Sequence, residues 1–173
     1  MKEWALIDGL TGIANRRRCE QALQEAMARC RRYDEPFTIF LWDIDHFKQI
    51  NDVYGHEVGD QVLRQMAQLA RSKIRASDVV GRWGGEAFFL LLPHTRLGAA
   101  MQLIERLRRA VMAEVVVGDR LVKASFGVAE YRGDDDPAGF LARADAALYT
   151  AKAAGRNHVR AHPPLASQPI AIL

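Results

Sequence analysis

Carboxylates and a glycine pair lie beside two apolar runs of this chain. Asp43 and Asp45 directly follow one run, and Glu86 follows Gly84-Gly85 and precedes the other. Open α/β sheets bind ligands at the carboxyl ends of strands, and glycines in a hairpin let a ligand approach the backbone. Converging carboxylates are the oxygen ligands that Mg²⁺ prefers beside substrate phosphates. Spacing alone leaves a second interpretation open, in which these acids only solvate loops.

The segment after Asp43 and Asp45 is too polar to belong to the core, and its residue types are not those of a simple linker. It carries Lys48, Asn51, His56 and Asp60. An amide presents both a donor and an acceptor, and a carboxylate accepts from N–H groups, so Asn51 and Asp60 together can read the edge of a purine.

Two cations near the other end of the chain have a spacing suited to phosphate. Lys152 and Arg156 are four positions apart, which puts them on one face at the end of a helix, where they could hold triphosphate oxygens. The alternative is that each only complements the dipole at a helix C-terminus.

The elements that must position these residues follow from periodicity and turn residues. Helices are predicted over residues 16–32, 60–74, 95–113 and 137–154, and strands over residues 37–42, 79–80, 87–92, 115–117 and 121–129. Thr95 is the predicted cap of the third helix, and Asp136 with Pro137 begins the last. Gly55 and Gly59 are expected in the loop that precedes the helix over residues 60–74. The element order predicts an α/β (α+β) fold, with a mixed central β-sheet flanked by helices.

Composition favours one globular domain. The chain has 173 residues, of which 49% are hydrophobic and 26% charged, which excludes collagen, a wholly disordered tail and a disulfide scaffold. The formal net charge is only +3, and the basic stretches 16–18 and 31–32 lack interleaved aromatics, so no nucleic acid partner is expected. Cys19 and Cys30 fall within one predicted helix, where a disulfide between them is implausible.

The location expected from these features is the cytoplasm. Unpaired cysteines suit a reducing compartment. The chain has no apolar leader and no run of about 18 apolar residues, so we expect no membrane contact by this domain.

Four runs in order resemble the signatures of one family. They are Asp8-Gly9-Leu10-Thr11-Gly12-Ile13-Ala14-Asn15-Arg16-Arg17, Asp43-Ile44-Asp45-His46-Phe47-Lys48-Gln49-Ile50-Asn51-Asp52 with Gly55-His56 and Gly59-Asp60, Arg82-Trp83-Gly84-Gly85-Glu86-Ala87-Phe88, and Ala151-Lys152-Ala153-Ala154-Gly155-Arg156-Asn157. The chain resembles the GGDEF family, the diguanylate cyclase domain, over roughly residues 8–160.

The resemblance implies a palm-like fold similar to nucleotidyl cyclases. It also implies that the domain binds GTP with Mg²⁺ (or Mn²⁺) and condenses two GTP into cyclic di-GMP with release of pyrophosphate. Because each domain contributes half a site, a homodimer is required for turnover.

Carried over position by position, the resemblance assigns a role to each candidate residue. The Asp43 carboxylate, the Ile44 carbonyl and Glu86 would hold the metal, and Glu86 would also be the base. Lys48 would stabilise charge in the transition state. The GTP-binding set would be Asn51, His56, Asp60, Gly84, Gly85, Lys152 and Arg156.

A regulatory motif also resembles the family. Arg75 and Asp78 fit the RxxD pattern ahead of the signature loop, which grips cyclic di-GMP in product-inhibited cyclases, and Arg106 is a secondary contact of this inhibitory site.

One position departs from the family pattern. The loop reads Gly-Gly-Glu-Ala-Phe, so Ala87 stands where the family has a Glu that is held to be needed for turnover. Three explanations remain open: an engineered inactivating change, a natural variant that turns over slowly, or a domain that only binds nucleotide. Because the other positions are intact, we favour a cyclase lineage with one altered acid, with a GTP- or cyclic di-GMP-binding signalling module as the alternative.

The predicted boundaries follow from the same comparison. Residues 1–7 are interpreted as the remnant of a linker to an upstream sensory domain, residues 8–161 as the cyclase domain, and residues 162–173 as a flexible tail, because three prolines interrupt it.

Overall fold

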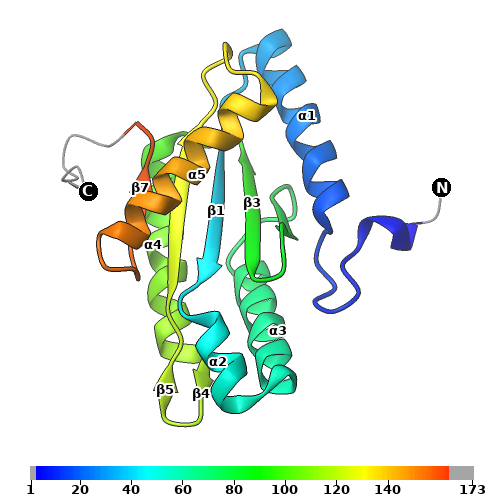
Figure 1. Ribbon diagram of the computed structural model, residues 1–173. Helices are drawn as coiled ribbons and strands as arrows, with labels where there is room; N and C mark the ends of the chain where they lie inside the picture. Colours follow the sequence, from blue (N-terminus) through cyan, green and yellow to red (C-terminus); the bar gives the residue numbers. More distant parts are fainter. Residues whose placement is uncertain (1–2, 164–173) are drawn as a thin grey trace.

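The computed structural model describes residues 3–163 and has helices on both faces of one main sheet (Figure 1). The helices are η1 (a 3-10 helix, Glu3–Leu6), α1 (Arg16–Tyr33), α2 (Phe47–Tyr54), α3 (His56–Ser72), α4 (Leu97–Glu114) and α5 (Pro137–Ala153). The strands are β1 (Phe37–Ile44), β2 (Val79–Arg82), β3 (Ala87–Pro93), β4 (Val116–Val117), β5 (Arg120–Leu121), β6 (Ala124–Glu130) and β7 (Val159–Ala161). The α/β expectation with a mixed central sheet is confirmed.

Strand β1 is the centre of the main sheet because its run of aromatic and β-branched residues suits burial on both faces. The strand order is β2-β3-β1-β6-β7, with β1 antiparallel to both β3 and β6, and β7 parallel to β6. Strands β4 and β5 form a separate hairpin. The last residues of β1 therefore lie between two neighbouring strands, and this end of the sheet carries the acids.

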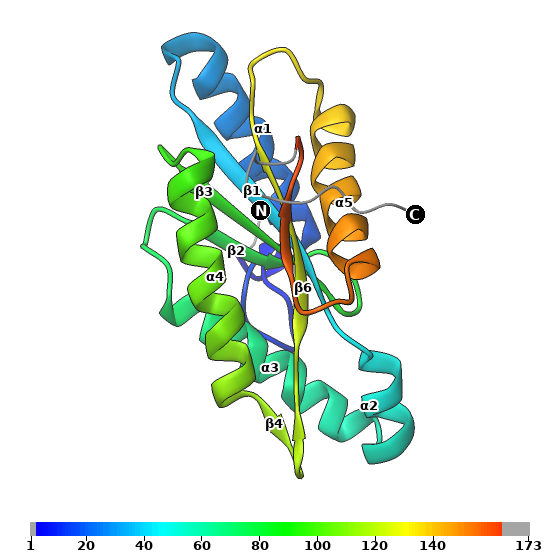
Figure 2. The same ribbon diagram turned by 90° about the vertical axis from the view of Figure 1, so that its left-hand side faces the viewer.

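Alternate residues of β1 enter two different apolar clusters. Phe40 and Trp42 pack with α2, α3 and α4, whereas Phe37, Ile39 and Leu41 pack with α1 and α5. Figure 2 views the sheet from the side of β7, with α4 and α5 on opposite sides of the strands. The period of two places the next odd-numbered side chain, that of position 43, on the face covered by α1 and α5.

Helix α5 packs closely on β6 because Gly127 has no side chain. A Cβ atom at Gly127 would lie 2.2 Å from the Ala144 carbonyl oxygen and 2.3 Å from the Leu148 nitrogen. At the start of the helix the Asp136 side chain accepts from the Gly139 N–H at 2.7 Å, with Pro137 in the first turn, as predicted. The cap and the close contact together fix where the end of α5 reaches the sheet.

The sequence prediction was wrong about the connection after β1. Residues 47–54 form a separate helix, α2, and Gly55, with φ of 90°, separates it from α3. Gly59 lies inside α3 and is buried. Helix α2 has only eight residues and two buried side chains, Phe47 and Ile50, so its periodic pattern was too short to identify.

Two further details differ from the prediction. Thr95 does not cap α4; its hydroxyl donates to the Pro93 carbonyl, and the Leu97 N–H is satisfied by the Glu130 carboxylate at 2.7 Å. The predicted strand over residues 121–129 is divided, since β5 ends at Leu121 and β6 begins at Ala124.

The N-terminal helix η1 contacts the rest of the domain. Asn15 donates to the Leu6 and Ala5 carbonyls at 3.0 and 2.9 Å, so η1 packs on the start of α1. The predicted tail over residues 162–173 lies outside the described residues from position 164 onward. Cys19 and Cys30 are free thiols. No helix in the described part of the chain is long and apolar enough to cross a membrane.

Candidate active site

The central feature of the candidate site is an ion pair between Asp43 and Lys152. The Lys152 ammonium group donates to the Asp43 carboxylate, and the two side chains are 35% and 16% exposed, respectively. Asp43 stands near the end of β1, opposite Ala87 in β3 and Ser125 in β6. Helix α5, which carries Lys152, packs on β1 and β6, and this packing explains how residues 109 positions apart come to share one site.

Glu86 belongs to the same electrostatic group. Loss of hydration around its carboxyl group, together with the negative charge of Asp43, raises the pKa of Glu86 above its usual 4.5, while Lys152 opposes the shift. Of the acids predicted to converge, Asp43 and Glu86 do so. Loss of hydration is the larger cause of the raised pKa and the charge of Asp43 the second, and a divalent metal held by both carboxylates would relieve the repulsion between them.

The loop between β2 and β3 holds its shape through hydrogen bonds at its base. The N–H groups of Trp83 and Gly84 both donate to the Ala87 carbonyl, at 2.8 and 3.1 Å. Neither Gly84 nor Gly85 has a positive φ, so the turn itself does not require glycine. A Cβ atom at Gly85 would meet nothing within 4 Å, which leaves the backbone open to a ligand.

The first signature run holds this loop from the other side. Arg82 donates to the Gly85 carbonyl at 2.8 Å and to the Asp8 carboxylate at 3.4 Å. Arg16, in the first turn of α1, lies over the Trp83 ring with its guanidinium carbon 3.9 Å from the ring centroid. The motifs contain these residues, but their spacing predicted no role for them; in the structure they position the loop.

Asn51 is predicted to read a purine, and its amide lies against α3. The Asn51 side-chain oxygen is buried and has no hydrogen-bond partner in the described structure, an arrangement that normally costs about 1–3 kcal/mol. A Cβ atom at Gly59 would lie 1.8 Å from this oxygen. Asp60 is the next residue of α3 and is half-buried, and His56 is exposed in the first turn of α3. Asn51 therefore lies at the α2–α3 contact, next to the turn of α3 that carries Asp60.

Asp45 does not join the other two carboxylates. It is 7% exposed, and its two oxygens accept from the Ser125 hydroxyl at 2.6 Å and from the Asn157 N–H at 2.8 Å. The expectation that it would converge with Asp43 is wrong because Asp45 lies just beyond the end of β1, where Ser125 and the Asn157 backbone bind it. Asp45 instead binds the segment that follows α5.

That segment carries the second predicted phosphate ligand. Gly155, Arg156 and Asn157 have φ angles of 109°, 64° and 49°, so three residues in a row lie in the left-handed region, which is unfavourable for the last two. The Asp45 hydrogen bond holds the segment in place and leaves the Arg156 side chain exposed. Lys48 is also exposed, on α2.

These oxygen donors suit a hard divalent cation whose coordination shell is completed by substrate phosphates. Within residues 3–163 no three His, Cys, Asp or Glu side chains form a ready-made metal cluster. Asp43 and Glu86 supply two carboxylates, and the backbone at Ile44 can add a carbonyl. Mg²⁺ is commonly held by one or two carboxylates plus phosphates, which this set can provide.

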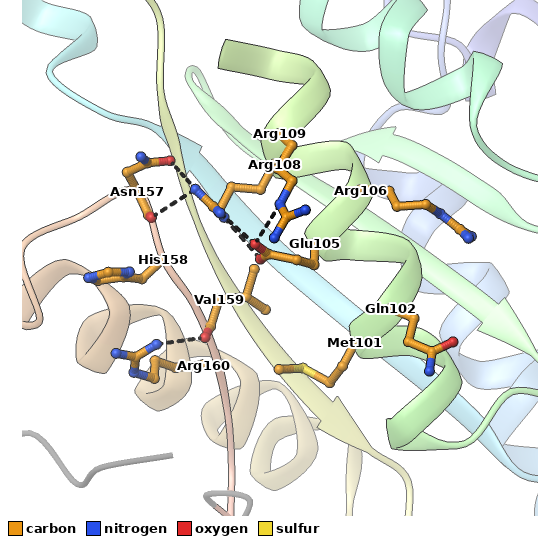
Figure 3. Close-up of a pocket in the computed structure, with 10 residues that line it drawn as sticks. All are labelled: Met101, Gln102, Glu105, Arg106, Arg108, Arg109, Asn157, His158, Val159 and Arg160. Carbon is orange, nitrogen blue, oxygen red and sulfur yellow. Dashed lines mark hydrogen bonds and ion pairs between the residues drawn. The ribbon is translucent and has the colours of Figure 1, made fainter. Parts of the chain in front are cut away.

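The candidate inhibitory residues form a closed turn at the far edge of the sheet. The Arg75 N–H and guanidinium donate to the Asp78 carboxylate at 2.8 and 3.3 Å, and that side chain is only 1% exposed, whereas Arg75 is 62% exposed. Arg106 lines a different pocket, an open groove of about 810 Å³ between α4 and β7. Figure 3 shows Arg106 on α4 directed away from β7.

Comparison with protein families and with known proteins gives one consistent result. The family model "Diguanylate cyclase, GGDEF domain" matches residues 5–158. Among curated proteins, the chain is 41% identical over 161 residues to diguanylate cyclase DgcP of Pseudomonas aeruginosa, covering 91% of this chain and 24% of that protein. It is also 41% identical over 163 residues to response regulator PleD of Caulobacter vibrioides, covering 91% and 36%. The chain thus spans about a quarter to a third of these relatives.

Solved structures agree with the fold. The GGDEF domain of DgcB from Caulobacter crescentus in complex with c-di-GMP superposes with a TM-score of 0.89 at 31% identity, covering 94% of this chain and 99% of that one. Diguanylate cyclase SiaD of Pseudomonas aeruginosa, in complex with its activator SiaC, gives 0.87 at 42% identity, covering 92% and 62%. The active GGEEF domain of a diguanylate cyclase from Vibrio cholerae gives 0.81 at 36% identity, covering 86% and 97%.

Proposed function

Because the chain belongs to the GGDEF family of diguanylate cyclase domains, we propose that it binds GTP and condenses two GTP into cyclic di-GMP and pyrophosphate. The observation that carries the proposal is the meeting of Asp43, Glu86 and Lys152, which come from a strand, a loop and a helix. Phosphoryl transfer depends mainly on positioning and on neutralising charge; two acids that can hold a divalent cation, beside a lysine, are suited to both.

The proposed roles follow the chemistry of each side chain. Asp43, Glu86 and the Ile44 carbonyl hold Mg²⁺ or Mn²⁺, which when bound neutralises charge on the phosphates. Glu86 accepts the proton of the attacking 3′-hydroxyl; its raised pKa favours proton uptake. Lys152, which pairs with Asp43 in this structure, would bind the triphosphate, and Lys48 would stabilise charge in the transition state.

Guanine recognition is assigned to the contact between α2 and α3. The unpartnered Asn51 oxygen supports this assignment, because a guanine N–H would satisfy it. Asp60 accepts from further N–H groups of the base, and His56 lines the same pocket. Gly84 and Gly85 allow the substrate to approach the backbone of the loop.

Turnover is proposed to require two copies of the chain. One chain carries one such site, and the reaction joins two GTP molecules, each attacking the α-phosphate of the other. Because the chain spans only about a quarter to a third of DgcP and PleD, an upstream sensory domain that brings two copies together is proposed here.

Turnover with GTP and Mg²⁺, followed by chromatography of the nucleotides, tests the proposal. The wild-type chain and Ala87→Glu are compared at concentrations that give dimers. We expect cyclic di-GMP from the Glu version, and less or none from the wild type, because Glu at position 87 adds a carboxylate beside Asp43. Absence of product from both versions, with dimers present, overturns the enzymatic proposal.

Ala87 itself favours a second candidate function. A domain without this acid can keep nucleotide binding and lose turnover, and would then signal by contact as a GTP- or cyclic di-GMP-binding module. Binding of either nucleotide by isothermal calorimetry, without turnover in either version, supports this candidate.

Product inhibition is proposed to use Arg75 as the main contact. Its guanidinium is exposed, whereas the Asp78 carboxylate is already bound by Arg75 and orients it. Arg106 is the proposed secondary contact. If Arg75→Ala leaves the affinity for cyclic di-GMP unchanged, the inhibitory site lies elsewhere.

A further inference from the structure

A pocket with no assigned role lies beside the proposed phosphate site. It has a volume of about 440 Å³ and is lined by residues of the β1–α2 turn, the β4–β5 hairpin and the segment after α5. Figures 1 and 2 show α2 and the β4–β5 hairpin at the same end of the sheet. Its lining includes Asp45, His46, Arg120, Lys123, Arg156 and Asn157.

The charge of this pocket is strongly positive. Arg120, Lys123 and Arg156 supply three cations, and the acid in the lining is Asp45. Asp45 is buried and accepts from the Ser125 hydroxyl and the Asn157 N–H, and among the described residues it forms no ion pair with these cations. Clustered cations without acidic partners favour an anionic ligand.

The cations are held at the pocket rather than spread over the surface. Arg120 donates to the Gln49 side chain of α2 at 3.3 Å, which leaves most of its five N–H donors available. The Lys123 carbonyl accepts from the Asp45 N–H at 2.8 Å, which fixes the backbone below its exposed side chain.

Asn157, one of the residues that line the pocket, is held by hydrogen bonds on two sides. Asn157 is bound by Asp45 on one side, and on the other its side-chain oxygen accepts from Arg108 at 3.0 Å. Arg108 in turn pairs with Glu105 of the same helix, and Figure 3 shows Arg108 between the two partners. These hydrogen bonds anchor the end of the left-handed segment 155–157 and so position the backbone of the neighbouring Arg156.

The position of the pocket indicates which anion it receives. Arg156 belongs both to the proposed triphosphate site and to this pocket, and Asp45 directly follows the Ile44 carbonyl assigned to the metal. A chain of phosphates that starts at the metal and passes Arg156 would continue toward Arg120 and Lys123. We propose that Arg120 and Lys123 form a second anion subsite, which binds the terminal phosphates of GTP and then the pyrophosphate.

This inference rests on the proposed function and adds the fate of the leaving group. When the 3′-oxygen forms its bond to the α-phosphorus, the bond from that phosphorus to the bridging oxygen breaks. The pyrophosphate keeps the electron pair, and the 3′-hydroxyl proton passes to Glu86. Two guanidinium or ammonium groups at the pyrophosphate stabilise the negative charge that develops there.

Calorimetric titration in the presence of Mg²⁺ tests the subsite without turnover. The ligands are GTP, GMP and pyrophosphate, and the proteins are the wild type and Arg120→Ala/Lys123→Ala. We expect the double variant to lose about tenfold or more in affinity for GTP and pyrophosphate, because two charge-assisted contacts are removed, and to keep its affinity for GMP.

The control variant is Arg32→Ala/Arg132→Ala, which removes the same charge from exposed positions outside the pocket. It should bind all three ligands as the wild type does, and both double variants should keep the wild-type melting temperature. Equal loss of GMP and GTP affinity, or similar pyrophosphate affinity in all proteins, overturns the subsite. Failure of the wild type to bind GTP overturns the proposed function instead, and the pyrophosphate titration still decides the subsite.

Discussion

The Asn51 side-chain oxygen occupies the space that a Cβ atom at Gly59 would need. The separation between that oxygen and the ideal Cβ position would be 1.8 Å, and the amide carbon would be 2.9 Å away. Any side chain at position 59 must therefore move the Asn51 amide. This makes Gly59, a residue with no functional atoms, a determinant of the proposed guanine pocket.

Gly59→Ala is expected to abolish selective binding of guanine nucleotides. The methyl group displaces the Asn51 amide, and GTP affinity measured by calorimetry should fall at least tenfold toward that of ATP. The matched control is Gly98→Ala in α4, where a Cβ atom meets nothing within 4 Å. It should leave GTP affinity unchanged and stabilise the helix by up to about 1 kcal/mol. Unchanged selectivity in Gly59→Ala would show that Asn51 does not read the base.

Ala87→Glu is expected to change stability in a metal-dependent manner. Position 87 pairs with Asp43 across the strands, and like charges directly opposite each other are destabilising. In the presence of a chelator, the melting temperature should fall below that of the wild type by a few degrees, corresponding to about 1 kcal/mol. Mg²⁺ with GTP should reverse the loss. The neutral variant Ala87→Gln should show neither effect, and equal behaviour of the Glu and Gln variants would contradict the electrostatic explanation.

Lys152→Met is expected to raise the pKa of Glu86 further above 4.5, because Lys152 is the group that lowers it. A raised pKa in the folded state means that folding favours the protonated acid, so the associated stability is present at low pH and is lost as the pH rises through that pKa. Carboxyl NMR titration measures the shift. Lys73→Met, an exposed lysine at the end of α3, is the control. An unchanged Glu86 titration would mean that Lys152 does not act on it.

Asp135 should make the fold sensitive to acid. Hydrogen bonds from Arg143, at 2.7 and 3.2 Å, hold the pKa of Asp135 below its usual 3.8, against the effect of burial. The stability from this pair is therefore present above about pH 4 and is lost as the pH falls through the lowered pKa. Arg143→Met should cost about 3 kcal/mol at pH 7 and flatten the acid part of the stability curve.

The control for Arg143 is an exposed ion pair. Arg109 lies 3.4 Å from Glu105 and its side chain is 73% exposed, so Arg109→Met should cost less than about 1 kcal/mol. Chemical denaturation at a series of pH values gives both results. Equal losses in the two variants would contradict the assigned role of Arg143.

The elements with strong local signals were predictable from sequence. The apolar run of β1, the hairpin around Gly84-Gly85 and the Asp136-Pro137 start of α5 are confirmed within a residue or two, because each depends on residues close in the chain. Helix α2 and strand β7 were missed because eight and three residues are too short for a period to stand out. The predicted cap of α4 was wrong because the residue that accepts from the Leu97 N–H is Glu130, 33 residues further along the chain.

In the candidate site, too, local features could be predicted from sequence and long-range contacts could not. That Asp43 ends a strand could be predicted from its position, and the structure adds its ion pair with Lys152. Asp45 has the same local signal but is bound by Ser125 and Asn157, which are 80 and 112 residues away. Only the register of β1 with β6 and the path of the segment after α5 decide between the two acids.

The place of Ala87 at the very start of β3 has a consequence for the history of such domains. Its side chain is half-buried at the rim, while the next residue, Phe88, begins the packed interior. Alanine and glutamate codons can differ by a single base. A lineage could therefore switch between a domain that makes a messenger and one that only senses it in one mutational step, with the interior of the protein untouched.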